Sequence, residues 1–140
     1  MSMQLINMGV RWQQQKSAPF SMTVNTALAG SANDTFVLPL YLIDHVKVDW
    51  GDGTYSNHTT GGDVTHVYPS SGIYNIKITG KASQVIRFNN VGDKAKLISV
   101  DSFGDFIFTT ATGMFYGCSN LTTLDVSSWD VSSVTNFQHF

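Results

Sequence analysis

The stretch Val48-Asp49-Trp50-Gly51-Asp52-Gly53-Thr54 decides the fold class of this chain. Apolar residues alternate with polar ones from Val46 to Trp50, which is the period of a half-buried β-strand. The segment Gly51-Asp52-Gly53 then predicts a turn, because glycine adopts positive φ at little cost and aspartate bonds to nearby amides. A second alternating run follows at 65–79. Strand, turn and strand in this order indicate β structure for the first half of the chain.

Length, charge and cysteine content narrow the class of protein. A chain of 140 residues is long enough to bury a core in one or two small domains. The formal net charge of −2 gives no electrostatic basis for binding nucleic acid or an anionic membrane. The one cysteine, Cys118, excludes an internal disulfide framework. No apolar run approaches the roughly 20 residues that a membrane-spanning helix needs.

The first residues, Met1–Lys16, predict no secretory signal peptide. They contain no continuous apolar core, and Arg11 follows the apolar residues of the segment instead of preceding them. Two interpretations of Met1–Lys16 remain open. The segment adds an edge strand to its own domain, or it docks into a neighbouring subunit as an assembly anchor.

Further strands are predicted where apolar and polar residues alternate. They cover 20–26, 35–40, 84–88 and 97–101. Pro39 restricts the second of them to a sheet edge or to a strand end, because proline has no N–H for the ladder. Residues 109–116 fit a short helix that ends at Gly117.

The last third of the chain contains an internal repeat. Leu121 and Leu124 lie three residues apart beside Asn120 and Cys118, which suggests a leucine-rich turn followed by a strand. The sequence Asp-Val-Ser-Ser occurs at 125–128 and again at 130–133. Residues 112–115 align with 137–140 at a shift of about 25 residues, a length typical of stacked repeats.

The first half resembles the PKD domain, a small immunoglobulin-like sandwich. The resemblance rests on three segments with the spacing of that family: Asp49-Trp50-Gly51-Asp52-Gly53-Thr54, His66-Val67-Tyr68 and Gly72-Ile73-Tyr74-Asn75-Ile76. The chain differs from the commonest form of the family, because no residue separates Trp50 from Gly51. The resemblance implies a β-sandwich scaffold.

The second half resembles the BspA-type (DUF285) leucine-rich surface repeat. The matching residues run from Met114-Phe115-Tyr116-Gly117-Cys118 through Leu121 and Leu124 to Trp129-Asp130-Val131 and Val134-Thr135-Asn136. This family implies adhesion or surface presentation on bacteria and some phages, without catalysis. Because stacked repeats need neighbours to bury their faces, we expect an apolar edge near Phe140 that a longer natural chain or a partner subunit covers.

The only set that combines acidic residues with a histidine near a predicted turn is Asp49, Asp52, Asp63 and His66. A catalytic pair among them would need a pocket and a shifted pKa, which a short turn does not supply. We expect Asp52 to bond turn amides and His66 to pack on Trp50. A calcium ion across the three carboxylates is the alternative, although calcium takes six to eight oxygens.

Several single residues have a structural and a functional interpretation. We expect Cys118 to be a buried thiol that serves as a small apolar group. Exposed aromatic rings stack on sugars or anchor interfaces, and Tyr41, Tyr55 and Trp129 are the candidates. Of these, Trp129 is expected to fill the core of the repeat, and Tyr55, at the tip of the hairpin, to be exposed.

The sequence therefore predicts an all-β, non-enzymatic protein without cofactor or metal. Its predicted parts are an arm at 1–16, an immunoglobulin/PKD-like sandwich at 17–80 and the start of a leucine-rich solenoid at 81–140. The function predicted is that of a phage virion component, such as a tail fibre, appendage or decoration protein. Its predicted partners are other subunits through Met1–Lys16, a host-surface glycan or protein, and further copies of itself. The alternatives are a bacterial cell-surface adhesin fragment and a carbohydrate-binding accessory module.

Overall fold

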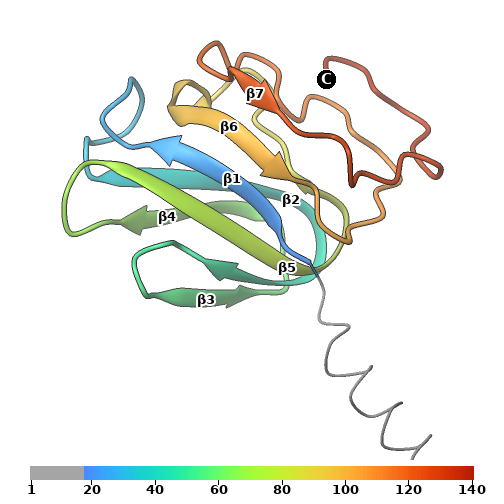
Figure 1. Ribbon diagram of the computed structural model, residues 1–140, viewed down its shortest axis with the longest axis horizontal. Coiled ribbons are helices and arrows are strands. Elements are labelled where there is room, and N and C mark those ends of the chain that lie inside the picture. Colours follow the sequence, from blue (N-terminus) through green and yellow to red (C-terminus); the bar gives the residue numbers. More distant parts are fainter. Residues whose placement is uncertain (1–17) are drawn as a thin grey trace, which may run out of the picture.

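The computed structural model describes residues 18–140, and these residues form an all-β structure without α-helix (Figure 1). The predictions for Met1–Lys16 lie outside the described residues. The elements are β1 Phe20–Asn25, β2 Thr35–Asp49, β3 Tyr55–His58, β4 Gly62–Val67, β5 Ile73–Ile86, the 3-10 turn η1 Lys94–Lys96, β6 Leu97–Ser102 and β7 Thr123–Leu124. The all-β class predicted from the sequence is therefore confirmed.

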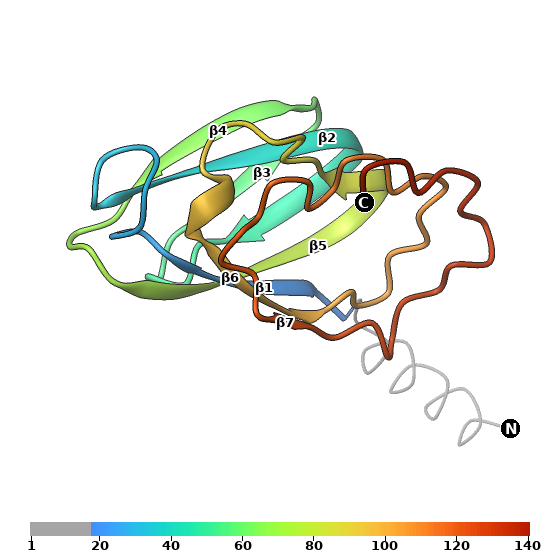
Figure 2. The same ribbon diagram turned by 90° about the horizontal axis from the view of Figure 1, so that it is seen from above.

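All seven strands belong to one mixed sheet. Its order is β3-β2-β5-β1-β6-β7, with β4 paired to β2 as well. Every pairing is antiparallel except that of β6 with β7, which is parallel. Figure 2 shows β2 and β5 as the two long strands that the other elements flank. The 15-residue β2 has two partners along one edge. Residues 35–40 pair with β4 and residues 46–49 pair with β3, while β5 pairs along the other edge.

Two strands are longer than the sequence predicted. The segments at 35–40 and 46–50 belong to one strand, β2, which bulges around Ile43 instead of ending. Pro39 does not end the strand, because it lies inside β2 opposite Asp63 of β4, but it does lie at a local sheet edge on its other side. The last pair of β2 with β5 is Leu40 with Ile86, so the missing N–H of Pro39 falls where that ladder has ended.

The segment at 84–88 is likewise no separate strand, because Gln84 to Ile86 continue β5 from Ile73. The boundary predicted between residues 80 and 81 falls inside this strand. In addition β6, from the second predicted part, pairs with β1 from the first. The sheet thus runs across the predicted boundary, and the division into domains stays a prediction.

The helix predicted at 109–116 is wrong. Residues 112–117 form consecutive turns instead, and Gly113 and Gly117 have φ values of 60° and 86°. An α-helix needs negative φ throughout, so Gly113 interrupts the predicted helix, whereas Gly117 lies at its predicted end. The backbone of this segment also bonds outside itself, because the amides of Ala111, Gly113 and Phe115 donate to the carbonyls of Asn136, Gln138 and Phe140.

These bonds stack two turns of chain on each other at an offset of about 25 residues. The amide of Thr122 donates to Ile98, and that of Asp125 donates to Val100. The side-chain amide of Asn120 reaches the carbonyl of Ala95 at 2.8 Å. We call 97–118 the first turn and 119–140 the second turn. The orange and red chain in Figure 1 shows them lying side by side.

One apolar core serves the whole described chain. It joins buried side chains of all the long strands with those of the first turn, including Phe20, Phe36, Ile76, Val100 and Phe108. The ammonium group of Lys96 is buried with them and donates to the backbone carbonyls of Ser31, Ala32 and Thr35 at 2.7–3.0 Å. Asp93, also buried, accepts from the amides of Ser31 and Val37. This polar pair fixes the loop between β1 and β2 to the start of the first turn.

Candidate functional site

The turn between β2 and β3 is held by side chains that bond its own backbone. Asp49 accepts from the amide of Gly51 at 3.0 Å, and Asp52 accepts from the amide of Thr54 at 3.1 Å. The role predicted for Asp52 in the turn is confirmed. Gly51 and Gly53 have φ values of 84° and 87°, which favour glycine. A Cβ at Gly51 would lie 2.3 Å from the carbonyl oxygen of Asn75, so this turn packs directly on β5.

Four aromatic rings assemble around this turn, and we call them the aromatic corner: Trp50, His66, Tyr68 and Tyr74. His66 stacks on Trp50, with ring centroids 4.4 Å apart and an angle of 6° between the planes, as predicted. Tyr68 meets His66 edge-on and stacks on Tyr74 at 3.7 Å. The hydroxyl of Tyr68 donates to the carbonyl of Trp50 at 2.7 Å. These contacts tie the end of β2 to β4 and β5.

The electrostatics of the corner indicate a structural role. His66 Nε2 lies 2.8 Å from a carboxylate oxygen of Asp52. Partial burial opposes ionisation of Asp52, but the hydrogen bonds from Thr54 and His66 outweigh it and lower the pKa of this carboxyl. Burial raises the pKa of the Tyr68 phenol above its usual 10. The carboxylate is therefore ionised and the phenol neutral at neutral pH, so both are fixed hydrogen-bonding groups.

A row of hydrogen-bonded side chains lies beside the corner, and it was not predicted from the sequence. The indole Nε1 of Trp50 donates to the hydroxyl of Ser56 at 2.9 Å, and this hydroxyl lies 2.8 Å from Nε2 of His58. Serine and histidine at this distance are the first two members of a nucleophilic triad. However, neither residue lines a described cavity, and the Ser56 oxygen accepts from Trp50. The signal in the sequence was the spacing of two in Ser56-Asn57-His58, which puts both side chains on one face of β3.

The three carboxylates weighed as a calcium site do not converge. Asp49 and Asp52 bond the turn, whereas Asp63 lies opposite Pro39 on β4. Within residues 18–140, no three histidine, cysteine, aspartate or glutamate residues form a group that could hold a metal ion.

Tyr55 is the exposed aromatic residue of this end of the sheet, with 58% of its surface accessible. The sequence predicted that Tyr55 lies at the tip of the hairpin. In the structure it is the first residue of β3, opposite Asp49, and so lies just beyond that tip. The ammonium of Lys47 lies 4.6 Å from its ring centroid. A shallow hollow of about 220 Å³ borders the ring, with Lys77 and Thr79 on its far side.

The predicted repeat residues lie in the two stacked turns. Phe115 is buried and Gly117 turns the chain, while Leu121 and Leu124 are half-buried against the core. Cys118 is also half-buried, and burial raises the pKa of its thiol to about 12. This thiol is therefore neutral and weakly nucleophilic at neutral pH.

Trp129 is the centre of the aromatic packing in the second turn. It stacks on Phe103 of the first turn at 4.3 Å and on Phe140 at 5.5 Å. Its ring is half-buried, and its buried indole Nε1 has no hydrogen-bond partner among the described residues. Trp129 therefore fills the space between the turns, in the position the sequence predicted.

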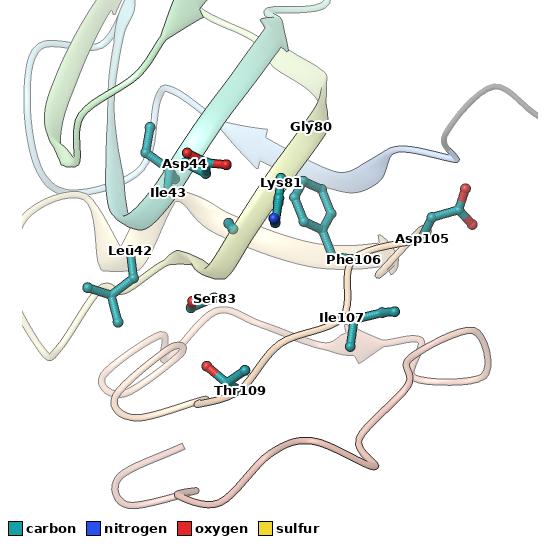
Figure 3. Close-up of a pocket in the computed structure, with 11 residues that line it drawn as sticks. Leu42, Ile43, Asp44, Gly80, Lys81, Ser83, Asp105, Phe106, Ile107 and Thr109 are labelled. Carbon is teal, nitrogen blue, oxygen red and sulfur yellow. The ribbon is translucent and has the colours of Figure 1, made fainter.

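An open groove of about 630 Å³ lies between β5 and residues 105–109 (Figure 3). Leu42 and Ile43 from the bend of β2, Lys81 and Ser83 from β5, and Ile107 from the facing segment are among its lining residues. No sequence pattern indicated this groove, because its walls come from segments more than 20 residues apart.

Comparison with known proteins gives no assignment. The chain matches no protein-family model, no curated protein and no solved structure at a significant level. Among the described residues, no helix has the length and apolar character needed to cross a membrane.

Proposed function

We propose that this chain is a non-enzymatic structural and adhesion protein, and specifically a subunit of a phage virion such as a tail fibre, appendage or decoration protein. In this proposal the sheet is a PKD-like scaffold and the two stacked turns begin a BspA-type leucine-rich solenoid. Met1–Lys16 anchors the chain to neighbouring subunits, including other copies of itself. The opposite end displays a binding surface towards a host glycan or protein.

The observation that carries the proposal is the outer layer of the second turn. Val126, Val131 and Phe137 each expose 47% of their surface, and none of the residues from Ser119 to Phe140 is fully buried. The first turn, by contrast, contributes Phe103, Phe108 and Met114 to the core, each with no exposed surface. An apolar layer exposed in this way is typical of a surface that another polypeptide covers.

The test is whether assembled particles contain the chain. Mass spectrometry of purified virions from the source phage should detect it in stoichiometric amounts. The variant Val131→Ser should reduce incorporation while lowering the melting temperature only slightly, because this residue is 47% exposed. Ile73→Ser, at a position 63% exposed on β5, is the matched control and should be incorporated normally. Absence of the chain from purified particles would refute the virion assignment and favour the bacterial-surface alternative.

The exposed ring of Tyr55 favours a second candidate, a carbohydrate-binding module. Aromatic faces stack on sugars, and the neighbouring Lys47 and Asp49 supply polar groups beside the ring. A glycan array should then show binding that Tyr55→Ala abolishes and that Tyr116→Ala, a tyrosine 41% exposed in the first turn, preserves. An array without signal would exclude this candidate.

A further inference from the structure

The shallow hollow beside Tyr55 lies on the face of the sheet that points away from the core. Asp49 of β2 is opposite Tyr55 of β3 on one side and opposite Lys77 of β5 on the other. Side chains of directly opposed residues share a face, so these three form one row across three strands. Lys47, two residues before Asp49, projects from the same face. Val48, between them, points to the other face and has no exposed surface.

The strands beneath the hollow are already paired on both edges. Residues 47–49 of β2 pair with β3 and with β5, while Lys77 and Ile78 of β5 pair with β2 and with β1. Their amides and carbonyls are engaged in the sheet ladders, so a ligand at this place is recognised by side chains and not by strand addition. The hollow of about 220 Å³ is smaller than the ~300–1,000 Å³ of clefts that enclose drug-sized molecules, so it suits a single small ring.

Two ammonium groups and one carboxylate surround the hollow. Lys47 and Lys77 are exposed, and neither makes an ion pair within residues 18–140. One oxygen of Asp49 accepts from the amide of Gly51, which leaves its other oxygen, among the described residues, for a ligand hydroxyl. The hollow thus has one more positive than negative charge, and the complementary ligand is an anion that also offers hydroxyl groups.

The Tyr55 ring adds a surface for C–H groups. This residue is 58% exposed, and the ammonium of Lys47 lies over the ring, 4.6 Å from its centroid. A cation over one face of an aromatic ring leaves the other face for the apolar C–H face of a sugar. A simple inorganic anion would leave this ring uncovered, and a neutral sugar would gain nothing from the surplus ammonium group. A sugar ring that carries a carboxylate uses both features.

We propose that this hollow binds an acidic sugar, a saccharide unit with a carboxylate on its ring. C–H groups of the sugar pack on Tyr55, while its carboxylate binds the ammonium groups of Lys47 and Lys77. A sugar hydroxyl donates to the carboxylate of Asp49. The inference rests on the carbohydrate-binding candidate described above and names the class of sugar which that site recognises.

The test compares sugars with and without a carboxylate on the full chain. Methyl β-D-glucuronide carries a carboxylate where methyl β-D-glucoside carries a hydroxymethyl group, and the methyl glycoside of N-acetylneuraminic acid is a second acidic probe. At least one acidic sugar should bind about fivefold more tightly than the glucoside, the upper range for an exposed ion pair. It should also shift the backbone amide NMR signals of 47–49 and 77–79 in the labelled protein. The better-bound acidic sugar distinguishes a uronic acid from a sialic acid.

Single variants assign the roles of the side chains. Lys77→Gln should reduce the preference for the acidic sugar to less than about twofold, because it removes the surplus positive charge. Lys81→Gln, the same change on β5 but outside the hollow, is the matched control and should leave the preference unchanged. Tyr55→Ala should weaken the binding of acidic and neutral sugars alike. All three replace exposed residues, so melting temperatures close to that of the unsubstituted protein check that the fold is retained.

The possible outcomes separate this inference from the proposals on which it builds. Glucoside binding as tight as that of both acidic sugars, and abolished by Tyr55→Ala, would overturn the acidic preference and leave a carbohydrate-binding module in place. Absence of binding for every sugar would remove both. A preference that survives Lys77→Gln, or shifts confined to amides elsewhere, would refute the assigned site. None of these results depends on whether virions contain the chain.

Discussion

The aromatic corner and the second turn both stack aromatic rings around a tryptophan, but they are completed in different ways. In the corner, Trp50 is 2% exposed, its carbonyl accepts from Tyr68, and its indole donates to Ser56. In the second turn, Trp129 is half-buried and its indole nitrogen has no described partner. The corner is closed by this chain alone, whereas the second turn leaves an apolar layer on its outside.

This difference separates the part of the molecule that confers stability from the part suited to interaction. The corner joins β2, β4 and β5, so its loss would unfold the sheet. The second turn adds to the first turn through backbone bonds, through Trp129 on Phe103 and through Phe140 on Phe115, and none of its own residues is fully buried. Substitutions in the two regions should therefore differ in their effect on the free energy of unfolding.

The largest difference is expected between the two tryptophans. Trp50→Ala should lower the free energy of unfolding by about 4 kcal/mol, because it empties a closed site. Trp129→Ala should lower it by about 2 kcal/mol, because its ring is only partly buried. Urea denaturation followed by circular dichroism measures both. Equal losses would show that the second turn is as integral to the fold as the corner.

The turn of the corner allows a comparison between two glycines with nearly the same φ. Gly51→Ala should destabilise the protein by about 3 kcal/mol, because its Cβ meets the carbonyl of Asn75 at 2.3 Å in addition to the strain of positive φ. Gly53→Ala carries only that strain, about 1 kcal/mol, since no atom lies within 4 Å of its Cβ. Similar thermal unfolding of both variants would mean that the turn moves away from β5 without penalty.

A smaller effect is expected from single hydroxyl groups. Tyr68→Phe removes a buried hydrogen bond to the carbonyl of Trp50 and should cost about 1–2 kcal/mol. Tyr74→Phe removes an exposed bond to the carbonyl of Ser70 and should cost less than about 0.5 kcal/mol, because water replaces it. Chemical denaturation of the two variants side by side checks the order. A larger loss for Tyr74→Phe would show that the exposed bond to Ser70 contributes more to stability than the buried bond to Trp50.

The sequence predicted local patterns well and long-range continuity poorly. Alternation identified β1 and β6, and the Asp-Gly turn with His66 and Trp50 gave the corner correctly. It divided β2 after Leu40 and began a new strand at Gln84, because bulges and strand partners that pass these points are not local properties. It missed β3 because Tyr55-Ser56-Asn57-His58 has polar residues on both faces of an edge strand.

The helix predicted at 109–116 is a second case in which contacts distant in the sequence determine the local structure. Its residues, three threonines and a glycine among eight, are weak helix formers, and Gly113 at positive φ and the backbone bonds to 136–140 determine the outcome. The repeat offset of 25 residues was visible in the sequence, although the groove that follows from it was not. A groove between β5 and residues 105–109 depends on where β1 begins, and only the sheet order shows that.

The smallest expected effect is on the pH dependence of the free energy of unfolding in acid. One carboxylate in each region can be compared there. The pKa of Asp52 in the folded protein lies below its ordinary value of 3.8, so the folded state binds fewer protons than the unfolded state around and below that value. Stability contributed by Asp52 is thus present above about pH 4 and is lost as the pH falls further. Asp52→Asn should flatten this acid limb in urea midpoints measured between about pH 5 and pH 2.

Asp125 in the second turn is the matched carboxylate, because the hydroxyl and amide of Ser127 also lower its pKa. It is fully exposed, so salt should screen its contribution more strongly than that of Asp52, which is paired with His66. Asp125→Asn should therefore change the acid limb slightly at low salt and hardly at all at high salt, while Asp52→Asn keeps most of its effect. If high salt abolished both effects equally, the carboxylate of the corner would be as open to solvent as that of the second turn.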